Sequence, residues 1–261
     1  MEPNETNLDS FQNTCRAPSP SQLLRDRPYR WSDLYKTPLR ARLALDREAQ
    51  HDAFALRYKS YLADGYIDPN PTGLFSDAYD ESPTSRTIVV YSGRDAIGSA
   101  RISTLDVLSA PRAVSTLPAS TVFAEEVSEI VRRLPEIGRP KRAVEVARLV
   151  RHPAYAKDQG LIFSLFRLVG YTITELDADI VLSCVRPNHV PFYRRMQFEV
   201  IAGPRRYYNV KFTAHLLACE RSSYGEVRRH VPVLNVSPSL RAAYAGLLRG
   251  ESVPVSVSLR F

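Results

Sequence analysis

The chain has 261 residues, of which 44% are hydrophobic and 24% charged, with 35 Lys and Arg against 28 Asp and Glu. This composition is close to that of average globular proteins and excludes a disordered, collagen-like or disulfide-rich chain. No apolar run reaches the roughly 18 residues that a membrane span needs. The polar start shows no secretory signal, so we expect a cytoplasmic protein without a membrane span.

Residues 1–44 are rich in Pro, Ser, Asn and Arg without clear periodicity, which predicts an irregular N-terminal extension. Helical spacing of apolar residues, an Asp at the N-cap position and a Gly just past the end predict a helix over 46–64. An acidic loop at 75–81 follows. Two apolar runs, 87–92 and 96–103, flank a short turn and predict a β-hairpin.

A second helix is predicted over 121–134, and a strand over 144–150. The next predicted helix, 160–177, presents one apolar face. The continuous apolar run at 179–185 is typical of a strand in the middle of a sheet. A short helix at 188–195 begins close to the end of this strand.

Two further strands are predicted at 198–201 and 210–219, and a last helix at 238–249. The alternation of helices and strands predicts a mixed α/β sheet with helices on both sides. We expect this fold to occupy residues 45–220, with a C-terminal extension at 221–261 that contains the last helix.

The three cysteines, Cys15, Cys184 and Cys219, are odd in number and far apart in the sequence, which indicates free thiols. The sequence has no CxxC motif and no close pair of His. We therefore expect no metal site.

The net charge of +7 includes two strongly basic stretches, 132–151 and 221–261. Such a surface suits an acidic partner. Nucleic acid is one candidate, although the chain carries no recognition-helix, zinc-finger or aromatic RNA-binding signature, and we expect none to be bound. An acidic carrier protein is another candidate, and an ordinary solvated surface is the third explanation.

Glu145 and Arg148 lie three residues apart on the strand predicted at 144–150, and regular strand alternation puts them on opposite faces. A bulge between them would bring both side chains to one face, and bulges are frequent beside active sites. The alternative is an ordinary strand, with one residue in a buried ion pair and the other solvated.

Four other charged residues are weak signals individually: Arg57 on the first helix, Asp77 and Asp80 in the acidic loop, and Arg101 within a hydrophobic strand. Tyr193 is placed differently, on the short helix at the carboxyl end of a central strand, where ligands bind in α/β folds. Tyr193 is therefore a candidate site residue, with a core aromatic as the alternative.

Together these residues resemble the GNAT acyltransferase superfamily, in its branch of acyl-homoserine-lactone synthases and long-chain N-acyl amino acid synthases. The stretch Asn188–Phe198 is similar to the superfamily's last motif, an Asn, then Phe-Tyr, then a Phe that opens the next strand. Glu145-Val-Ala-Arg148 resembles the Glu-x-x-Arg strand of the autoinducer-synthase branch. The resemblance covers about 46–220. The other charged positions of that branch match, in order, Arg57, Asp77, Asp80 and Arg101.

The resemblance implies a GNAT-like mixed, largely antiparallel sheet flanked by helices, with a splayed central pair of strands. It also implies an enzyme that transfers a long-chain fatty acyl group to the amine of an amino acid. Acyl carrier protein would be its partner, the carrier's acyl-phosphopantetheine its donor, and no cofactor would be tightly bound. Glu145 would act as the general base, Arg148 would hold it ionised or bind the acceptor carboxylate, and Tyr193 would be the acid. The implied acceptor-binding residues are Arg57, Asp77, Asp80 and Arg101. The implied donor-binding residues are Arg151, Gly160 and Asn188.

Two departures select among the activities of this superfamily. The Gly-rich loop that holds coenzyme A pyrophosphate in GNAT enzymes keeps only Gly160, with Ile162 in place of the second glycine, which favours a carrier-bound donor. Homoserine-lactone synthases carry a Trp after the first Arg, but Ile67 stands ten residues after it here and the one Trp is Trp31. We expect the acyl chain along the helix at 160–177. Lactone synthesis, acyl-CoA-dependent transfer and a non-catalytic basic binding module are the alternatives.

Overall fold

The computed structural model describes residues 37–106, 116–134, 141–207 and 209–257, which all belong to one compact unit, Trp31–Phe261. An eight-stranded sheet forms its centre, in the order β6-β7-β5-β4-β3-β2-β1-β8. The strands are β1 (Leu39–Leu43), β2 (Ser85–Ser92), β3 (Asp95–Asp106), β4 (Arg142–Arg151), β5 (Ile180–Val185), β6 (Glu199–Arg206), β7 (Thr213–Glu220) and β8 (Val253–Pro254). Among the described residues β4 and β5 run parallel, and the other neighbours run antiparallel.

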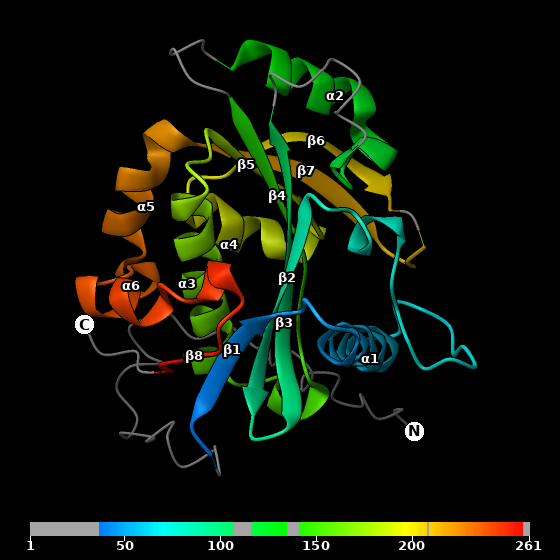
Figure 1. Ribbon diagram of the computed structural model, residues 1–261. Helices are drawn as coiled ribbons and strands as arrows, with labels where there is room; N and C mark the ends of the chain where they lie inside the picture. The colour runs from blue at the N-terminus through cyan, green and yellow to red at the C-terminus, as the bar shows by residue number, and fades with distance from the viewer. Residues whose placement is uncertain (1–36, 107–115, 135–140, 208, 258–261) are drawn as a thin grey trace, which may run out of the picture. The chain divides into compact units, whose positions relative to one another are not determined.

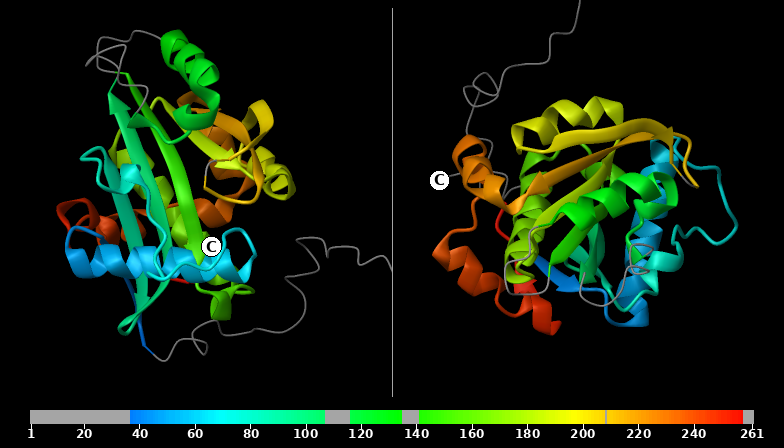
Figure 2. Two further views of the ribbon diagram at one scale, coloured as in Figure 1. Left: turned by 90° about the vertical axis from the view of Figure 1, so that its right-hand side faces the viewer. Right: turned by 90° about the horizontal axis from the view of Figure 1, so that it is seen from above.

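Helices cover both faces of the sheet, so the predicted mixed α/β fold is confirmed. Figure 1 shows α1 on one side of the strands and α3 with α6 on the other, and the turned view in Figure 2 shows α1 crossing the strands on its side. The helices are α1 (Arg47–Ala63), α2 (Ser120–Arg133), α3 (Gln159–Glu175), α4 (Val190–Arg195), α5 (Tyr224–His230) and α6 (Pro238–Tyr244). No helix of the described residues is long and apolar enough to span a membrane.

Side-chain caps fix where three of these helices begin. The Asp46 carboxylate accepts the backbone N–H of Ala49 at 2.7 Å at the start of α1, and Ser237 accepts that of Leu240 at α6. Asp158 caps α3 by accepting the Leu161 N–H at 3.0 Å. Each cap satisfies one of the backbone donors that the first helical turn leaves without an intrahelical partner.

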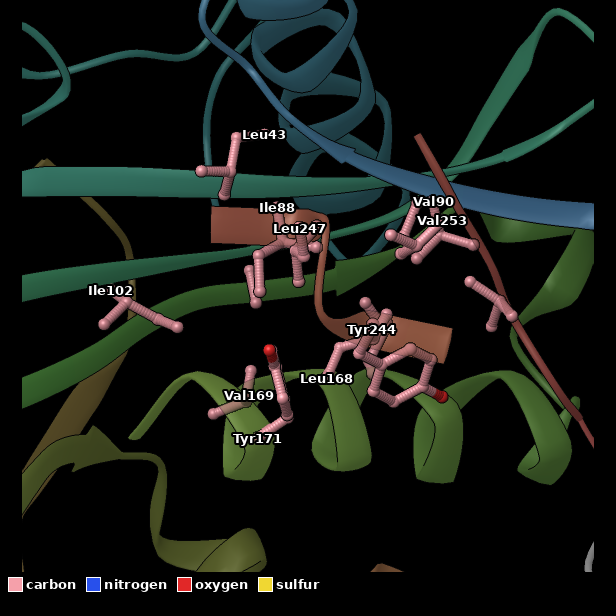
Figure 3. Packing of buried hydrophobic residues seen from close by; sticks show 14 of the residues in the cluster. Leu43, Ile88, Val90, Ile102, Leu168, Val169, Tyr171, Tyr244, Leu247 and Val253 are labelled. Atoms are coloured by element: carbon pink, nitrogen blue, oxygen red, sulfur yellow. The ribbon is translucent and has the colours of Figure 1, made fainter. Parts of the chain in front are cut away.

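The two faces of β2, β3 and β4 differ in character. On one face Ile88, Ile102 and Val144 pack with Leu168 of α3 and Tyr244 of α6, all almost fully buried, as Figure 3 shows for part of this core. Strand pairing places Thr87 opposite Arg101, Arg101 opposite Ala147, and Ser103 opposite Glu145. Residues directly opposite each other share a face, so the other side of the same strands carries a row of polar groups beneath α1.

The parallel pair β4–β5 splays after three residue pairs. Ala143, Val144 and Glu145 pair with the first three residues of β5, and the two strands then diverge. At the point of divergence the Ser183 hydroxyl donates to the Val146 carbonyl at 2.9 Å. The splayed central pair predicted from the resemblance is therefore present.

Strands from both predicted extensions belong to the sheet, which differs from the irregular segment predicted over 1–44. β1 buries Leu39, Ala41 and Leu43 on alternate positions and pairs with β2 and β8. The Pro- and Arg-rich context hides this alternation in the sequence. β8 has two residues and α5 has seven, about two turns, so both are too short to show a periodic signal. Cys15 and the first 36 residues lie outside the described residues, whereas Cys184 and Cys219 are free thiols.

Candidate active site

Three buried arginines and two aspartates form an ion network between α1 and the polar row of the sheet. The Arg57 guanidinium, completely buried, donates to Asp80 at 2.7 Å and to the Thr87 hydroxyl at 3.0 Å. Arg101 is also completely buried and binds both Asp77 and Asp80. The acceptor-binding residues implied by the resemblance therefore lie together in space.

A local turn holds the two aspartates in place. Asp77 and Asp80 are the N-cap and third residue of the 3₁₀ turn Ala78–Asp80 and form a reciprocal capping box: Asp77 accepts the Tyr79 N–H, and Asp80 accepts the Asp77 N–H, both at 3.0 Å. Burial acts to raise the pKa of the Asp77 carboxyl, but the hydrogen bonds and charges of Arg101 and Arg148 outweigh it and lower that pKa to about 2. Asp77 is thus held ionised.

A bulge directs Arg148 into the same network. Arg148 and Leu149 together oppose the single residue Ala100 of β3, and Arg148 has a left-handed backbone, with φ 54°. Its guanidinium donates to Asp77 at 2.7 Å and lies 4.8 Å from the centre of the Phe75 ring. The bulge considered from the sequence is therefore present and brings Arg148 to the face that carries Glu145.

Glu145 is completely buried, and its two carboxyl oxygens have different surroundings. Oε2 accepts the backbone N–H of Ala119, just before α2, at 2.6 Å. Within the described part of the chain, Oε1 has no hydrogen-bond partner. Burial raises the pKa of this carboxyl to about 7, although the Ala119 hydrogen bond and the charges of Arg101 and Arg148 act to lower it. The group is therefore poised to exchange a proton near neutral pH.

Tyr193 approaches the splay from the opposite face of the sheet. It lies half-buried on α4, and its ring contacts the rings of Phe166 and Phe198. Burial raises the pKa of its phenol, while a hydrogen bond with Ser183 acts in the other direction. Because Ser183 marks the divergence of β4 and β5, the phenol lies at the splay and remains protonated at neutral pH.

The three implied donor-binding residues lie around the open end of the splay and at α3. Arg151 ends β4 and donates to the Asp158 carbonyl at 2.7 Å, and Asn188 is exposed just after β5. Gly160 is buried in the first turn of α3, where a Cβ would stand 3.0 Å from the Val257 carbonyl oxygen. Close packing against Val257 thus explains why a glycine stands at position 160, and the contact of Gly160 with a donor stays a prediction.

The structure adds residues that the sequence did not indicate. Burial raises the pKa of the Tyr207 phenol and of the Cys184 thiol, and the Glu145 charge acts on both in the same direction. Tyr207 also lines a groove of about 1160 Å³ between the loop before Asp77 and the β6–β7 hairpin. Tyr207 follows β6 without any periodic pattern, so only the hairpin's tertiary position reveals it.

The face of α3 on which we expected the acyl chain is filled with side chains. Leu161, Leu165 and Leu168 are completely buried against β3 and β4. Among the described residues the groove of about 1160 Å³ lies elsewhere, next to Tyr207. An acyl chain along α3 would have to displace the packed leucines.

Comparison with known proteins identifies the family. The model of the FeeM family, N-acyl amino acid synthases, matches residues 52–220. The chain belongs to this family. It is therefore an acyltransferase, and a non-catalytic binding module is excluded. A comparison with curated proteins finds no match.

Solved structures that share the fold include the two that follow. FeeM, an N-acyl amino acid synthase from uncultured soil microbes, is 20% identical, with a TM-score of 0.58 over 74% of this chain and 95% of that chain. BjaI, a CoA-dependent acyl-homoserine lactone synthase, is 17% identical, with a TM-score of 0.51 over 74% of this chain and 88% of that chain. These matches and the family confirm the GNAT-like, autoinducer-synthase-like fold.

Proposed function

We propose that this acyltransferase moves a long-chain acyl group from the phosphopantetheine arm of acyl carrier protein to the amine of an amino acid. The observation that carries the proposal is the Glu145 carboxyl, buried beside the splay, with one oxygen anchored and the other without a hydrogen-bond partner among the described residues. A base with a pKa of about 7 is well matched to taking a proton from an ammonium group at neutral pH.

The charges of the ion network support an acceptor that carries a carboxylate. Three guanidinium groups share two aspartate carboxylates, so these five side chains together carry one net positive charge. The Arg148 guanidinium lies over the Phe75 and Tyr61 rings, at the edge of this ion network. A carboxylate bound there would place the neighbouring amine of an α-amino acid close to Glu145.

Every proton that moves during the acyl transfer has a donor and an acceptor, with Glu145 and Tyr193 acting from the two faces of the sheet. The ammonium gives one proton to Glu145, and the resulting amine attacks the thioester carbonyl within the splay. Beyond Glu145 the pairing register of β4 with β5 ends, so the β4 N–H groups in this segment that point away from β3 could donate to the developing oxyanion. The carbon–sulfur bond then breaks, the thiolate takes a proton from Tyr193, and the nitrogen's second proton restores the phenol. Glu145 releases its proton to solvent.

The first turn of α3 supports a carrier-bound donor over acyl-CoA. A helix N-terminus binds a diphosphate when its N–H groups are free. Here the Asp158 carboxylate occupies one of them, and the Val257 carbonyl stands against Gly160. The carrier's arm bears a single phosphate, and the chain's net charge of +7 suits an acidic carrier.

The groove next to the site supports a long acyl chain. Its apolar wall includes Ile67, Leu74 and Val210, and it reaches Phe75 and Tyr207 beside the ion network. Each buried methylene contributes about 0.8 kcal/mol, so such a wall favours longer chains.

The test is incubation of the purified protein with acyl carrier protein or coenzyme A thioesters of matched acyl length and a mixture of amino acids, with products identified by mass spectrometry. We expect N-acyl amino acids from the carrier donor, and Glu145→Gln should lower their formation about a hundredfold. Glu125→Gln, exposed on α2, is the control. Absence of product with every carrier donor would refute the function. Faster transfer from coenzyme A, or an acylated lactone in a parallel incubation with S-adenosylmethionine as the acceptor, would establish one of the alternatives.

A further inference from the structure

A pair of basic side chains stands at the open end of the splay, beyond the residues treated above. Arg186 follows the last residue of β5, and His189 lies in the 3₁₀ turn after it. The Arg186 Nη2 atom is 3.2 Å from the His189 Nε2 atom. The Arg186 guanidinium also lies 4.3 Å from the centre of the Tyr66 ring and 5.8 Å from that of Phe212, so two aromatic rings hold it in place.

The positive charge of Arg186 is not neutralised by direct contact with a carboxylate of the described residues. Within the described part of the chain Arg186 forms no ion pair, and Asp64 at the end of α1 acts on it only at longer range. Burial lowers the pKa of His189, and the charges of Arg186 and Arg151 lower it further. An anion bound between these groups would be attracted by each of them.

We propose that Arg186 and His189 bind the phosphate of the donor's pantetheine arm. This inference rests on the proposed function, because it takes the donor from there. Beyond Glu145, β4 continues for six residues to Arg151, roughly 20 Å at the rise of a strand. Beyond Leu182, which pairs with Glu145, the chain of β5 continues for four residues to Arg186, roughly 13 Å. A reacting thioester at the splay therefore leaves the far end of an extended arm near this pair.

The pair has the chemistry that phosphate recognition needs. A guanidinium can donate two parallel N–H bonds to phosphate oxygens, and its planar face remains stacked on Tyr66 meanwhile. His189 lies beside it, and its second ring nitrogen adds an N–H donor when Nε2 accepts from Arg186. The first turn of α3, the other candidate for the phosphate, is occupied by the Asp158 carboxylate.

The experiment compares the binding of 4′-phosphopantetheine and dephosphorylated pantetheine to the full chain by calorimetry, without turnover. We expect the phosphorylated form to bind at least about tenfold more tightly, since a charge-assisted contact contributes that much. Arg186→Gln should remove this preference and leave pantetheine binding unchanged. His189→Gln should reduce the preference, and Arg194→Gln, exposed on α4, should retain it.

Equal binding of the two forms by the unmodified protein would overturn the inference, as would an unchanged preference in both Arg186→Gln and His189→Gln. Thermal melting checks that each variant is folded, and His189→Gln decides the result if Arg186→Gln unfolds. Coenzyme A, with its diphosphate, should bind no more tightly than 4′-phosphopantetheine. If the phosphorylated form binds more tightly in a way that depends on Arg186, but the protein transfers no acyl group, the phosphate site is supported and the proposed function is refuted.

Discussion

Replacing Glu145 by Gln should make the protein more stable at pH 8 and leave its stability unchanged at pH 4.5. The substitution keeps the side-chain shape, and the amide oxygen can still accept the Ala119 N–H that Oε2 accepts now. It removes only the possibility of a negative charge. In the native protein that charge is completely buried, whereas in the unfolded chain it is hydrated.

The magnitude follows from the pKa of the carboxyl, which rises from 4.5 to about 7 on folding. The native state therefore binds the proton more tightly than the unfolded state does, so the stability from this group is complete below pH 4.5. It is lost as the pH rises through about 7. A shift of roughly 2.5 units at 1.36 kcal/mol each gives about 3 kcal/mol. The unfolding free energy of Glu145→Gln should therefore exceed that of the unmodified protein by an amount that grows between pH 4.5 and about 7 and stays constant at higher pH.

Urea unfolding of both proteins at pH 5, 6, 7 and 8 measures the difference in unfolding free energy. Glu126→Gln is the control: a hydrogen bond from Arg205 lowers the pKa of that carboxyl below its usual 4.5, so Glu126 is mostly ionised in the folded and the unfolded chain at all four pH values and its stability difference should change little between them. A Glu145→Gln difference that is the same at all four pH values would refute the buried, proton-exchanging carboxyl.

Two further substitutions test the network and the acid. Asp77→Asn should lower the unfolding free energy at pH 7 by about 2 kcal/mol in urea titrations, because the carboxyl's pKa of about 2 reflects its pairing with Arg101 and Arg148; a loss below about 0.5 kcal/mol would contradict a stabilising network. Tyr193→Phe should lower the turnover of an alkyl thioester about a hundredfold but affect an aryl thioester much less, because a more acidic thiol leaves without a proton donor. Equal losses with both donors would assign the phenol to positioning alone.

Local signals were sufficient to predict most of the fold. The helices at 46–64 and 160–177 end within two residues of α1 and α3, because caps and apolar spacing act within a few residues of each other. The sequence does not predict β1, although its Leu and Ala alternate with Arg. A five-residue alternation in a Pro- and Arg-rich stretch is a weak strand signal, and the strand is stabilised by pairing with β2 and β8.

The site could be predicted only in part, because strand register is not a local property. The resemblance supplied the charged residues, but their shared face depends on the pairing of Arg101 with Ala147 and of Ser103 with Glu145. The anchor of Glu145 is a backbone N–H of Ala119, 26 residues away, which no side-chain pattern encodes. Tyr207 reaches the site through the β6–β7 hairpin, so its place follows from tertiary packing.

The position of Glu145 at the last paired residue of β4 and β5 links the fold to the proposed chemistry. Its backbone is flanked by Ser103 on β3 and by Leu182 on β5, so pairing on both sides restricts its motion. Beyond Glu145 the pairing register with β5 ends, and the Ser183 hydroxyl reaches across to the Val146 carbonyl. A base held this firmly at the end of the paired segment needs little reorganisation when charge develops on a bound thioester. Extending the parallel pairing by one residue would close the space that the donor needs, which gives a physical reason for the strands to part at this residue.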